Sequence, residues 1–390
     1  MRKVYLDNAA TTFVSSEVLA EMLPCFNTIY GNANSLHGFG RDAASLVDRA
    51  RDRIATAIGA AKSNEIYFTS GGTEADNWAI KGIAHAYKNK GKHIITSAIE
   101  HHAVLEACKQ LEAEGYEVTY LPVDSTGLVS LPDLIHEIRK DTTLVSIMAV
   151  NNEVGTIQNI KAIAKICHEY GVIFHTDAVQ AVGCVKINVQ DMEIDAMSIS
   201  AHKIYGPKGV GALYLKNGVR IDPLVIGGAQ ERAKRGGTTN VPGVVGFGKA
   251  VEIAVRDLSI NQQKLKAVRE YFISKVKERI PYIQVNGHAH QKIQGTVHIS
   301  FEMIEGESIL MLLDLEGVAV STASACTSNS LQPSHVLRAM GIPDEIAQGS
   351  IRFSFGKNIS KDDVDYVVDV LERAVSKLRA ISPITKAGRK

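Results

Sequence analysis

Apolar segments of strand length alternate with helical segments through the first part of the chain. The clearest is 144–150, a nearly unbroken apolar run of the kind found in strands that are covered on both faces. Other predicted strands share this character: 65–70, 93–97, 118–122, 172–177, 196–200 and 211–215. The alternation predicts an α/β fold with a mainly parallel sheet, in which ligands bind beyond the carboxyl ends of the strands.

The later part of the chain has a different pattern, which predicts a second, smaller α+β domain. A long charged helix is expected over 261–279. Strands near 296–301 and 351–355 and helices near 308–315 and 361–378 follow it. We expect a large domain over 16–257 and a small domain made of 1–15 and 258–390.

Local signals place further helices in the large domain. Ser15 and Ser16 can cap a helix that begins near Glu17. Helices are also predicted over the following ranges: 41–58, 76–88 and 160–170.

Composition excludes several classes of protein. The 390 residues carry a formal net charge of +1, which gives no sign of a nucleic acid or an anionic membrane as partner. No apolar run reaches the length of a membrane-spanning helix, and an acid follows the N-terminus too soon for a signal peptide. We therefore expect a cytoplasmic protein.

The cysteines argue against structural bridges and metals. There are five, an odd number, and no two form a CxxC pair. A disulfide framework and a structural zinc site are therefore both disfavoured, and no metal site is expected. Most of the five are expected to pack in the core.

One lysine stands where covalent chemistry is possible. The predicted strand 196–200 runs directly into His202 and Lys203, and a Gly/Pro-rich turn follows over 206–209. A partly desolvated lysine can lose its proton and form an imine with an aldehyde, and pyridoxal phosphate (PLP) is the aldehyde that proteins most often hold in this way. The alternative is an ordinary lysine that extends its ammonium into water.

Polar residues follow the ends of several predicted strands. Gly71, Gly72 and Thr73 lie between a strand and a helix, where backbone N–H groups can bind a phosphate; a simple turn is the alternative. The same position at or beyond a strand end is shared by Thr73, His101, Asn152, Asp177, Gln180, His202 and Lys203. This shared placement predicts that they meet at one edge of the sheet.

A thiol lies in a segment of small and polar residues. Cys326 stands within 320–330, where apolar neighbours are nearly absent. A cysteine of the core normally has apolar neighbours, so this pattern favours an exposed, reactive thiol on a loop.

These segments together resemble the cysteine desulfurases, a group within the class V aminotransferase superfamily of PLP-dependent enzymes with fold type I. The most specific matches are Ser-Ala-His-Lys-Ile-Tyr-Gly-Pro-Lys-Gly at 200–209 and Ser-Ala-Cys-Thr-Ser at 324–328. The resemblance runs from 5–12 to 351–354. The continuation at 331–338 resembles the NifS/IscS-like branch rather than the SufS-like branch.

The resemblance implies a set of cofactor contacts. It assigns PLP binding to Gly72, Thr73, His101, Asn152, Asp177, Gln180, Ser200, His202, Lys203 and Thr238. Lys203 would hold PLP covalently and then move protons at the substrate Cα. Asp177 would bond the pyridinium nitrogen, and Thr238 would reach the phosphate of a neighbouring subunit in a homodimer. His101 would stack on the ring and, as a catalytic residue beside Lys203 and Cys326, would transfer a proton.

The resemblance also implies the reaction. Arg352 with Asn152 would bind the carboxylate of L-cysteine. Cys326 would take the substrate sulfur as a persulfide and leave L-alanine. The acceptor stays open between an iron–sulfur scaffold and a tRNA-thiolation protein. The segment after 382–383 lacks the acidic-aromatic ending through which some members dock a scaffold, and Ala229 replaces a glycine that is frequent in the family.

Two alternative functions remain. A selenocysteine lyase or another class V PLP enzyme would use the same cofactor site, although an aminotransferase needs no thiol at Cys326. A scaffold that only binds partners is disfavoured, because it has no use for Lys203, Asp177 and His101 together.

Overall fold

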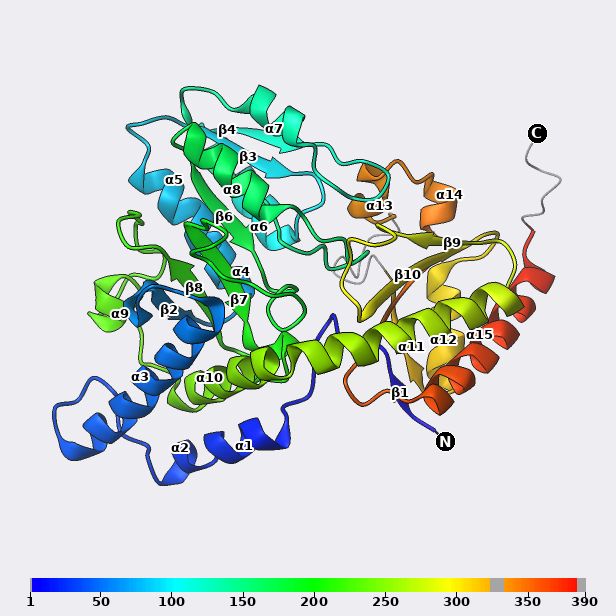
Figure 1. Cartoon of the computed structure of the whole chain (residues 1–390), viewed down its shortest axis with the longest axis horizontal. Coiled ribbons are helices and arrows are strands. Elements are labelled where there is room, and N and C mark those ends of the chain that lie inside the picture. Colours follow the sequence, from blue (N-terminus) through cyan, green and yellow to red (C-terminus); the bar gives the residue numbers. More distant parts are fainter. Residues whose placement is uncertain (1, 323–332, 384–390) are drawn as a thin grey trace.

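The computed structural model describes residues 2–322 and 333–383. Cys326 and the segment around it lie outside these residues. Figure 1 shows two lobes, which we call the large lobe (the elements from α1 to α10) and the small lobe (β1 and the elements from α11 to α15). The long helix α11 (Leu258–Arg279) runs from one lobe along the other.

The large lobe is built on a sheet of seven described strands in the order β2-β8-β7-β6-β5-β3-β4. Their bounds are β2 (Ile66–Thr69), β3 (His93–Ser97), β4 (Glu117–Leu121), β5 (Thr142–Ser146), β6 (Ile173–Asp177), β7 (Ala196–Ser200) and β8 (Gly211–Leu215). Strand β8 is antiparallel to both neighbours, and the other pairs are parallel. The prediction of an α/β fold with a mainly parallel sheet is therefore confirmed.

Helices and helical turns surround this sheet. They are α1 (Ser16–Met22), α2 (Pro24–Asn27), α3 (Gly38–Ile58), η1 (Ser63–Glu65), α4 (Gly72–Asn77), η2 (Trp78–Gly82), α5 (Ile83–Ala86), α6 (His102–Ala113), α7 (Leu131–Glu137), α8 (Ile160–Glu169), η3 (Ala201–Lys203), α9 (Gln230–Ala233) and α10 (Val241–Arg256). Leu144 packs in one apolar cluster and Val145 in another, so β5 is buried on both faces.

The small lobe has its own antiparallel sheet, in the order β12-β13-β10-β9, and a parallel pair of β1 and β11. Its strands are β1 (Val4–Tyr5), β9 (Ile283–Asn286), β10 (Thr296–Phe301), β11 (Val318–Ala319), β12 (Ser321–Thr322) and β13 (Ser350–Ser354). Besides α11, its helices are α12 (Gly306–Leu315), α13 (His335–Ala339), α14 (Asp344–Ala347) and α15 (Lys361–Ile381).

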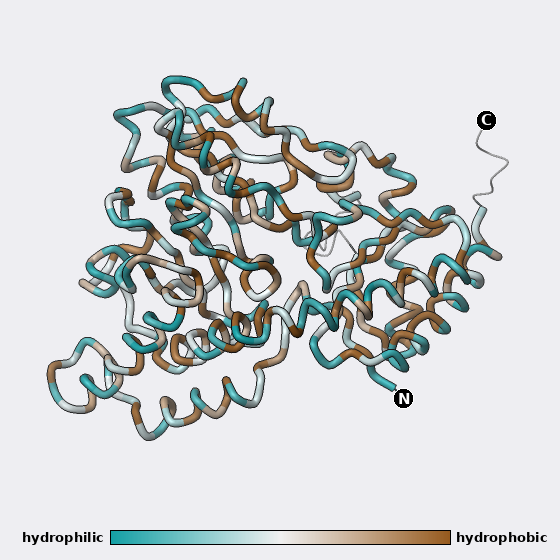
Figure 2. Tube along the Cα trace, viewed as in Figure 1, coloured by the Kyte–Doolittle hydropathy of each residue, from teal (hydrophilic) through white to brown (hydrophobic). Residues whose placement is uncertain are grey.

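The small lobe also has its own core. Phe272 of α11, Phe353 of β13 and Leu371 of α15 are fully buried in one cluster, together with Leu6 of the N-terminal segment. In Figure 2 the long helices α11 and α15 alternate between hydrophilic and hydrophobic colours, as expected for helices with one covered face. The domain boundaries at 16, 257 and 258 stay a prediction.

Several element predictions need correction. Strand β5 ends at Ser146, and the predicted strand over 147–150 is buried loop. Ile147 and Ala149 still donate to carbonyls of β6, but the backbone N–H of Met148 bonds to the Glu100 side chain. The helix predicted from 76 begins at Gly72, so Thr73 belongs to its first turn. Ser15 occupies the N-cap position of α1 but makes no side-chain capping bond. Helix α10 was missed, since its many small apolar residues lack a clear polar face.

None of the helices in the described ranges is both long enough and apolar enough to cross a membrane.

Candidate active site

A cavity of about 340 Å³ lies where the strands of the large lobe end, and Arg352 and Ser321 of the small lobe complete its wall. The predicted site residues that line it are Gly72, Thr73, His101, Asn152, Asp177, Gln180, Ser200, His202, Lys203 and Arg352. All except Arg352 come from strand ends of the large lobe, which its mainly parallel sheet gathers at one edge, whereas Arg352 comes from β13 of the small lobe.

Lys203 is positioned by a short turn after a buried strand. Strand β7 ends at Ser200, and the turn η3 carries Lys203 into the cavity. Its Nζ donates to the carbonyl oxygens of Ala9 and Ala10 at 2.6 and 2.7 Å. The N-terminal segment thus holds the amine in the cavity.

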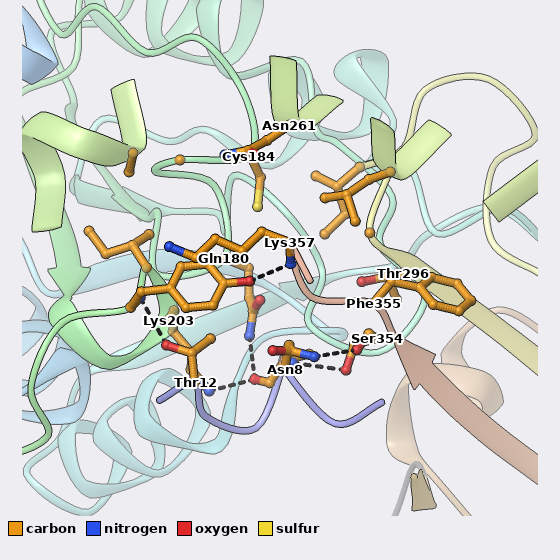
Figure 3. Close-up of a pocket in the computed structure, with 18 of the residues that line it drawn as sticks. Asn8, Thr12, Gln180, Cys184, Lys203, Asn261, Thr296, Ser354, Phe355 and Lys357 are labelled. Carbon is orange, nitrogen blue, oxygen red and sulfur yellow. Dashed lines mark hydrogen bonds between the residues drawn. The ribbon is translucent and has the colours of Figure 1, made fainter. Parts of the chain in front are cut away.

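That N-terminal turn is itself fixed by the small lobe. Asn8 Nδ2 donates to the Ser354 carbonyl at 2.8 Å, and the Ala9 N–H donates to Ser354 Oγ at 2.9 Å. Figure 3 shows these contacts beside an adjoining cavity of about 100 Å³, which shares Ala9, Gln180 and Lys203 with the first. The position of Lys203 therefore depends on how the two lobes meet.

Two buried carboxyl groups, those of Asp177 and Asp76, line the same cavity. Asp177 ends β6, and its Oδ1 accepts from the Val179 N–H at 2.8 Å. Burial raises the pKa of Asp177 to about 6, against the lowering effect of Lys203. Burial and then the Asp177 charge raise the pKa of Asp76 well above its ordinary value. Both pKa values are raised, and Lys203 favours the ionised form of Asp177, whereas the Asp177 charge disfavours that of Asp76.

Sequence reasoning missed Asp76. It was read only as the start of a helix, whereas it lies in the first turns of α4 and faces the cavity. An acidic residue followed by apolar residues in a buried helix was the signal that could have found it.

His101 caps helix α6 and is held neutral. Its Nδ1 accepts from the Ala103 N–H at 3.1 Å, so the neutral ring carries its proton on Nε2. Burial, and then the charge of Lys203, lower the pKa of His101 to about 4. At neutral pH the imidazole can therefore stack on an apolar ring without the cost of burying a charge.

Donors for an anionic group converge near the start of α4. The Ser200 hydroxyl is buried and has no hydrogen-bond partner within the described residues. A Cβ at Gly72 would lie 2.6 Å from Val179 Cγ2, so only glycine fits here. His202 contacts Thr11 Oγ1 at 3.1 Å, and burial lowers its pKa to about 4. The unsatisfied hydroxyl and the tight glycine fit a bound phosphate.

Arg352 is buried at the opposite wall. It is 6% exposed; its Nη2 donates to Asp7 Oδ1 at 3.0 Å and its Nη1 to the Asn152 carbonyl at 2.9 Å. Its Nε is buried and has no partner within the described residues. Two of the five guanidinium N–H donors are used in this way, and the remaining ones, including the unpartnered Nε, are left for a carboxylate ligand. Sequence reasoning missed Asp7, which gave no signal beyond its place in the motif at 5–12.

Two predicted residues are not part of this cavity. Thr238 is exposed on the loop after α9 and does not line it. Cys326 lies outside the described residues. The loop that carries Thr238 is anchored nearby, because Glu231 accepts both guanidinium bonds of Arg51 at 2.8 Å.

The other cysteines have structural surroundings. Cys25, Cys108 and Cys167 are buried, and Cys184 borders the adjoining cavity (Figure 3). Burial raises the pKa of the Cys184 thiol to about 11, so it is not a ready nucleophile. Within residues 2–322 and 333–383, no three His, Cys, Asp or Glu side chains are grouped as metal ligands would be.

Comparison with known proteins gives the same assignment for the whole chain. The Aminotransferase class-V family matches residues 4–367. The chain is 54% identical to a cysteine desulfurase IscS of Dictyoglomus turgidum, over 98% of this chain and 97% of the relative.

Solved structures agree. A NifS-like protein superposes with a TM-score of 0.91 at 41% identity, covering 97% of this chain and 100% of the other. A structure described as SspA in complex with cysteine has a TM-score of 0.81 at 36% identity and covers 90% and 99% of the two chains. The fold, the gathered cavity residues and these likenesses agree: the chain belongs to the Aminotransferase class-V family and, within it, to the cysteine desulfurases.

Proposed function

We propose that this protein is a PLP-dependent L-cysteine desulfurase that transfers sulfur to Cys326 as a persulfide and releases L-alanine. The observation that carries the proposal is the gathering of Lys203, Asp177, His101 and Arg352 around one cavity. An amine, a buried acid, a neutral ring and a carboxylate receptor at one place match the needs of a PLP enzyme that acts on an amino acid.

The residues present fit PLP. Ser200, Thr73 and His202 would hold its phosphate, with the unsatisfied Ser200 hydroxyl as the clearest vacancy in the hydrogen-bond pattern. Asp177 would bond the ring nitrogen, and Lys203 would hold the cofactor covalently. When bound, PLP stabilises negative charge that develops at the substrate Cα.

The protein's own groups then manage protons and orientation. Arg352 would hold the substrate carboxylate through Nε, the donor that has no partner within the described residues. Lys203 would take the proton from the substrate Cα and return one later. Neutral His101 would cover the ring face, and its low pKa keeps it uncharged beside Lys203.

Cys326 would complete the reaction as a nucleophile. Its thiolate would attack the sulfur of the bound cysteine, forming an S–S bond as the C–S bond breaks. The electron pair of the C–S bond stays on carbon, which takes a proton and leaves as alanine. This role depends on the motif at 324–328, since the residue lies outside the described ranges.

The partners follow from the same reading. We propose a homodimer, because Thr238 is exposed away from its own cavity and would reach the phosphate site of a second subunit. The persulfide would pass to an iron–sulfur scaffold or a tRNA-thiolation protein. A cytoplasmic location fits both acceptors.

The test compares three proteins: wild type, Cys326→Ala and Cys184→Ala. Each is scanned for visible absorbance after addition of PLP and is then assayed for sulfide and alanine from cysteine with a reductant. All three should gain the absorbance, and only Cys326→Ala should lose sulfide release. Cys184→Ala is the matched control, since its thiol borders the cavity that adjoins the site. Sulfide release by Cys326→Ala at the wild-type rate would contradict the mechanism.

A further inference from the structure

The small lobe has a second cavity, of about 720 Å³, between helix α11 and the segment that joins β9 to β10 (Figure 1). We call it the basic cavity, and it is lined by Lys266, Arg269, Glu270, Ile273, Ser274, Lys277, Val285, Gly287, His288, Ala289, His290, Lys292 and Gln294. Four of these residues are lysine or arginine and only one is acidic. It shares no lining residue with the active-site cavity.

Arg269 lies in the wall with an unsatisfied donor. It is 8% exposed, and its Nη1 is buried with no hydrogen-bond partner within the described residues. The one acidic side chain that lines the cavity is Glu270. Its Oε1 lies 3.9 Å from Arg269 Nη2, and its side chain is 58% exposed. Such a distant, solvated partner compensates little for the burial of a guanidinium.

Lys292 is a second cation in the wall, on the facing segment, and it is 4% exposed. Burial, and then the positive charge of Arg269, lower the pKa of Lys292 to about 8. Two mostly buried cations therefore face one cavity whose single acidic lining residue, Glu270, is itself largely exposed.

The segment that carries Lys292 is tied to the large lobe. The Ile293 N–H donates to the Gly155 carbonyl, and the Ile157 N–H donates to the Gln291 carbonyl, both at 2.9 Å. The His288 N–H also donates to Thr156 Oγ1 at 3.1 Å. These bonds on both sides of Lys292 fix the position of its segment against the large lobe.

Another group in the wall is also without a partner. Gln294 Oε1 is buried and accepts no hydrogen bond within the described residues. Ile273 and Val285 add apolar surface beside the charged side chains. The cavity thus offers cations for an oxyanion, an acceptor for a hydroxyl or N–H group, and a wall for carbon.

We propose that the basic cavity binds a small organic oxyanion, with its phosphate or carboxylate group on Arg269 and Lys292. The guanidinium fork matches either group with two parallel hydrogen bonds, and Lys292 adds a point charge. Gln294 accepts from a hydroxyl or amino group on the same molecule. This site is independent of the desulfurase reaction and of the PLP phosphate position.

The experiment titrates the full-length, PLP-loaded protein with inorganic phosphate and separately with citrate, at low ionic strength, in a calorimeter. PLP fills the phosphate position of the active site, and the variants below separate heat from the basic cavity from heat of an anion that binds at Arg352. Wild type should bind at least one of the two. Tighter binding of phosphate would indicate a phosphomonoester as the natural ligand, and tighter binding of citrate a carboxylate.

Variants locate the binding. Lys292→Met should weaken it by roughly tenfold or more, because it removes a charge-assisted bond from a buried position. Lys292→Arg should retain it, and Lys140→Met, at an exposed lysine of the large lobe, should not change it. Arg269→Gln should also weaken anion binding, and it replaces Lys292→Met in the test if that variant fails to fold. The proposal is wrong if wild type binds neither anion at millimolar concentration, or if Lys292→Met and Arg269→Gln bind as wild type does.

Discussion

The active-site cavity and the basic cavity both contain buried cations, but the two differ in how those charges are balanced. In the active site, Lys203 bonds to two carbonyls and Arg352 to Asp7. In the basic cavity, Arg269 Nη1 has no such partner in the described chain, and Lys292 is a second cation in the same wall. The first site is organised before any ligand arrives, whereas the second is completed only by an anion.

The comparison also shows a common feature. Each cavity has single donors without a partner at the place where a ligand group would bind: Ser200 Oγ and Arg352 Nε in one, Arg269 Nη1 in the other. Because buried polar groups are nearly always satisfied, such atoms indicate ligand positions better than cavity size does. The following predictions test this contrast.

The largest effect is expected at the preorganised amine. Lys203→Ala removes the only group proposed to move the substrate proton, so sulfide release should fall by roughly 10³-fold or more. The rates of sulfide release and of alanine production from cysteine measure this fall in activity. A circular-dichroism spectrum like that of wild type would show that the variant keeps its fold. A residual rate within tenfold of wild type would show that another residue carries the proton.

The next effect concerns the carboxylate receptor. Arg352→Gln should lower kcat/KM for cysteine by about 10–100-fold, since a charge-assisted bond is lost from a buried site. Asp7→Asn is the matched control, because it keeps a hydrogen-bond acceptor beside Arg352 but removes the charge that competes with substrate. Steady-state kinetics should show a KM no higher than wild type for Asp7→Asn. An equal loss of kcat/KM in both variants would mean that Asp7 is needed for substrate binding and does not merely compete with the substrate for Arg352.

A pH-dependent effect follows from Glu100, which is fully buried beside His101. Burial raises its pKa to about 8, so the folded protein holds a proton that the unfolded chain has released above its ordinary value of 4.5. Its contribution to stability is therefore lost as pH rises toward 8. Glu100→Gln keeps the acceptor for Ser97 and Met148 but does not titrate.

The free energy of unfolding of Glu100→Gln, relative to wild type, should rise by roughly 1–4 kcal/mol between pH 5 and pH 8. Denaturant unfolding of both proteins at the two pH values measures this difference. A constant difference across the range would show that Glu100 is ionised in the folded protein.

The smallest effect is expected in the basic cavity without a ligand. Lys292→Met removes a mostly buried charge and keeps most of the side-chain volume, so the melting temperature in buffer free of phosphate and citrate should rise by about 1–3 °C. Lys140→Met should not change it. A lower melting temperature for Lys292→Met would mean that the ammonium is already satisfied, and the contrast between the two cavities would disappear.

The sequence alone determined the class of fold and predicted most of the residues that line the candidate site. Strand-length apolar runs that end in polar residues are local features, and a parallel sheet brings all such ends to one edge. Asp177 and Lys203 could be identified for this reason. The motifs then indicated the reaction and its nucleophile, Cys326, which lies outside the described residues.

Only the tertiary structure decided how charges are balanced. Asp7 reaches Arg352 across 345 positions, and Asp76 lies beside Asp177 although a hundred residues separate them. Arg269 and Lys292 look like ordinary surface residues in sequence, because one belongs to a charged helix and the other to a polar segment. Whether a charge is hydrated, paired or left alone depends on which segments pack around it, and no local pattern records that.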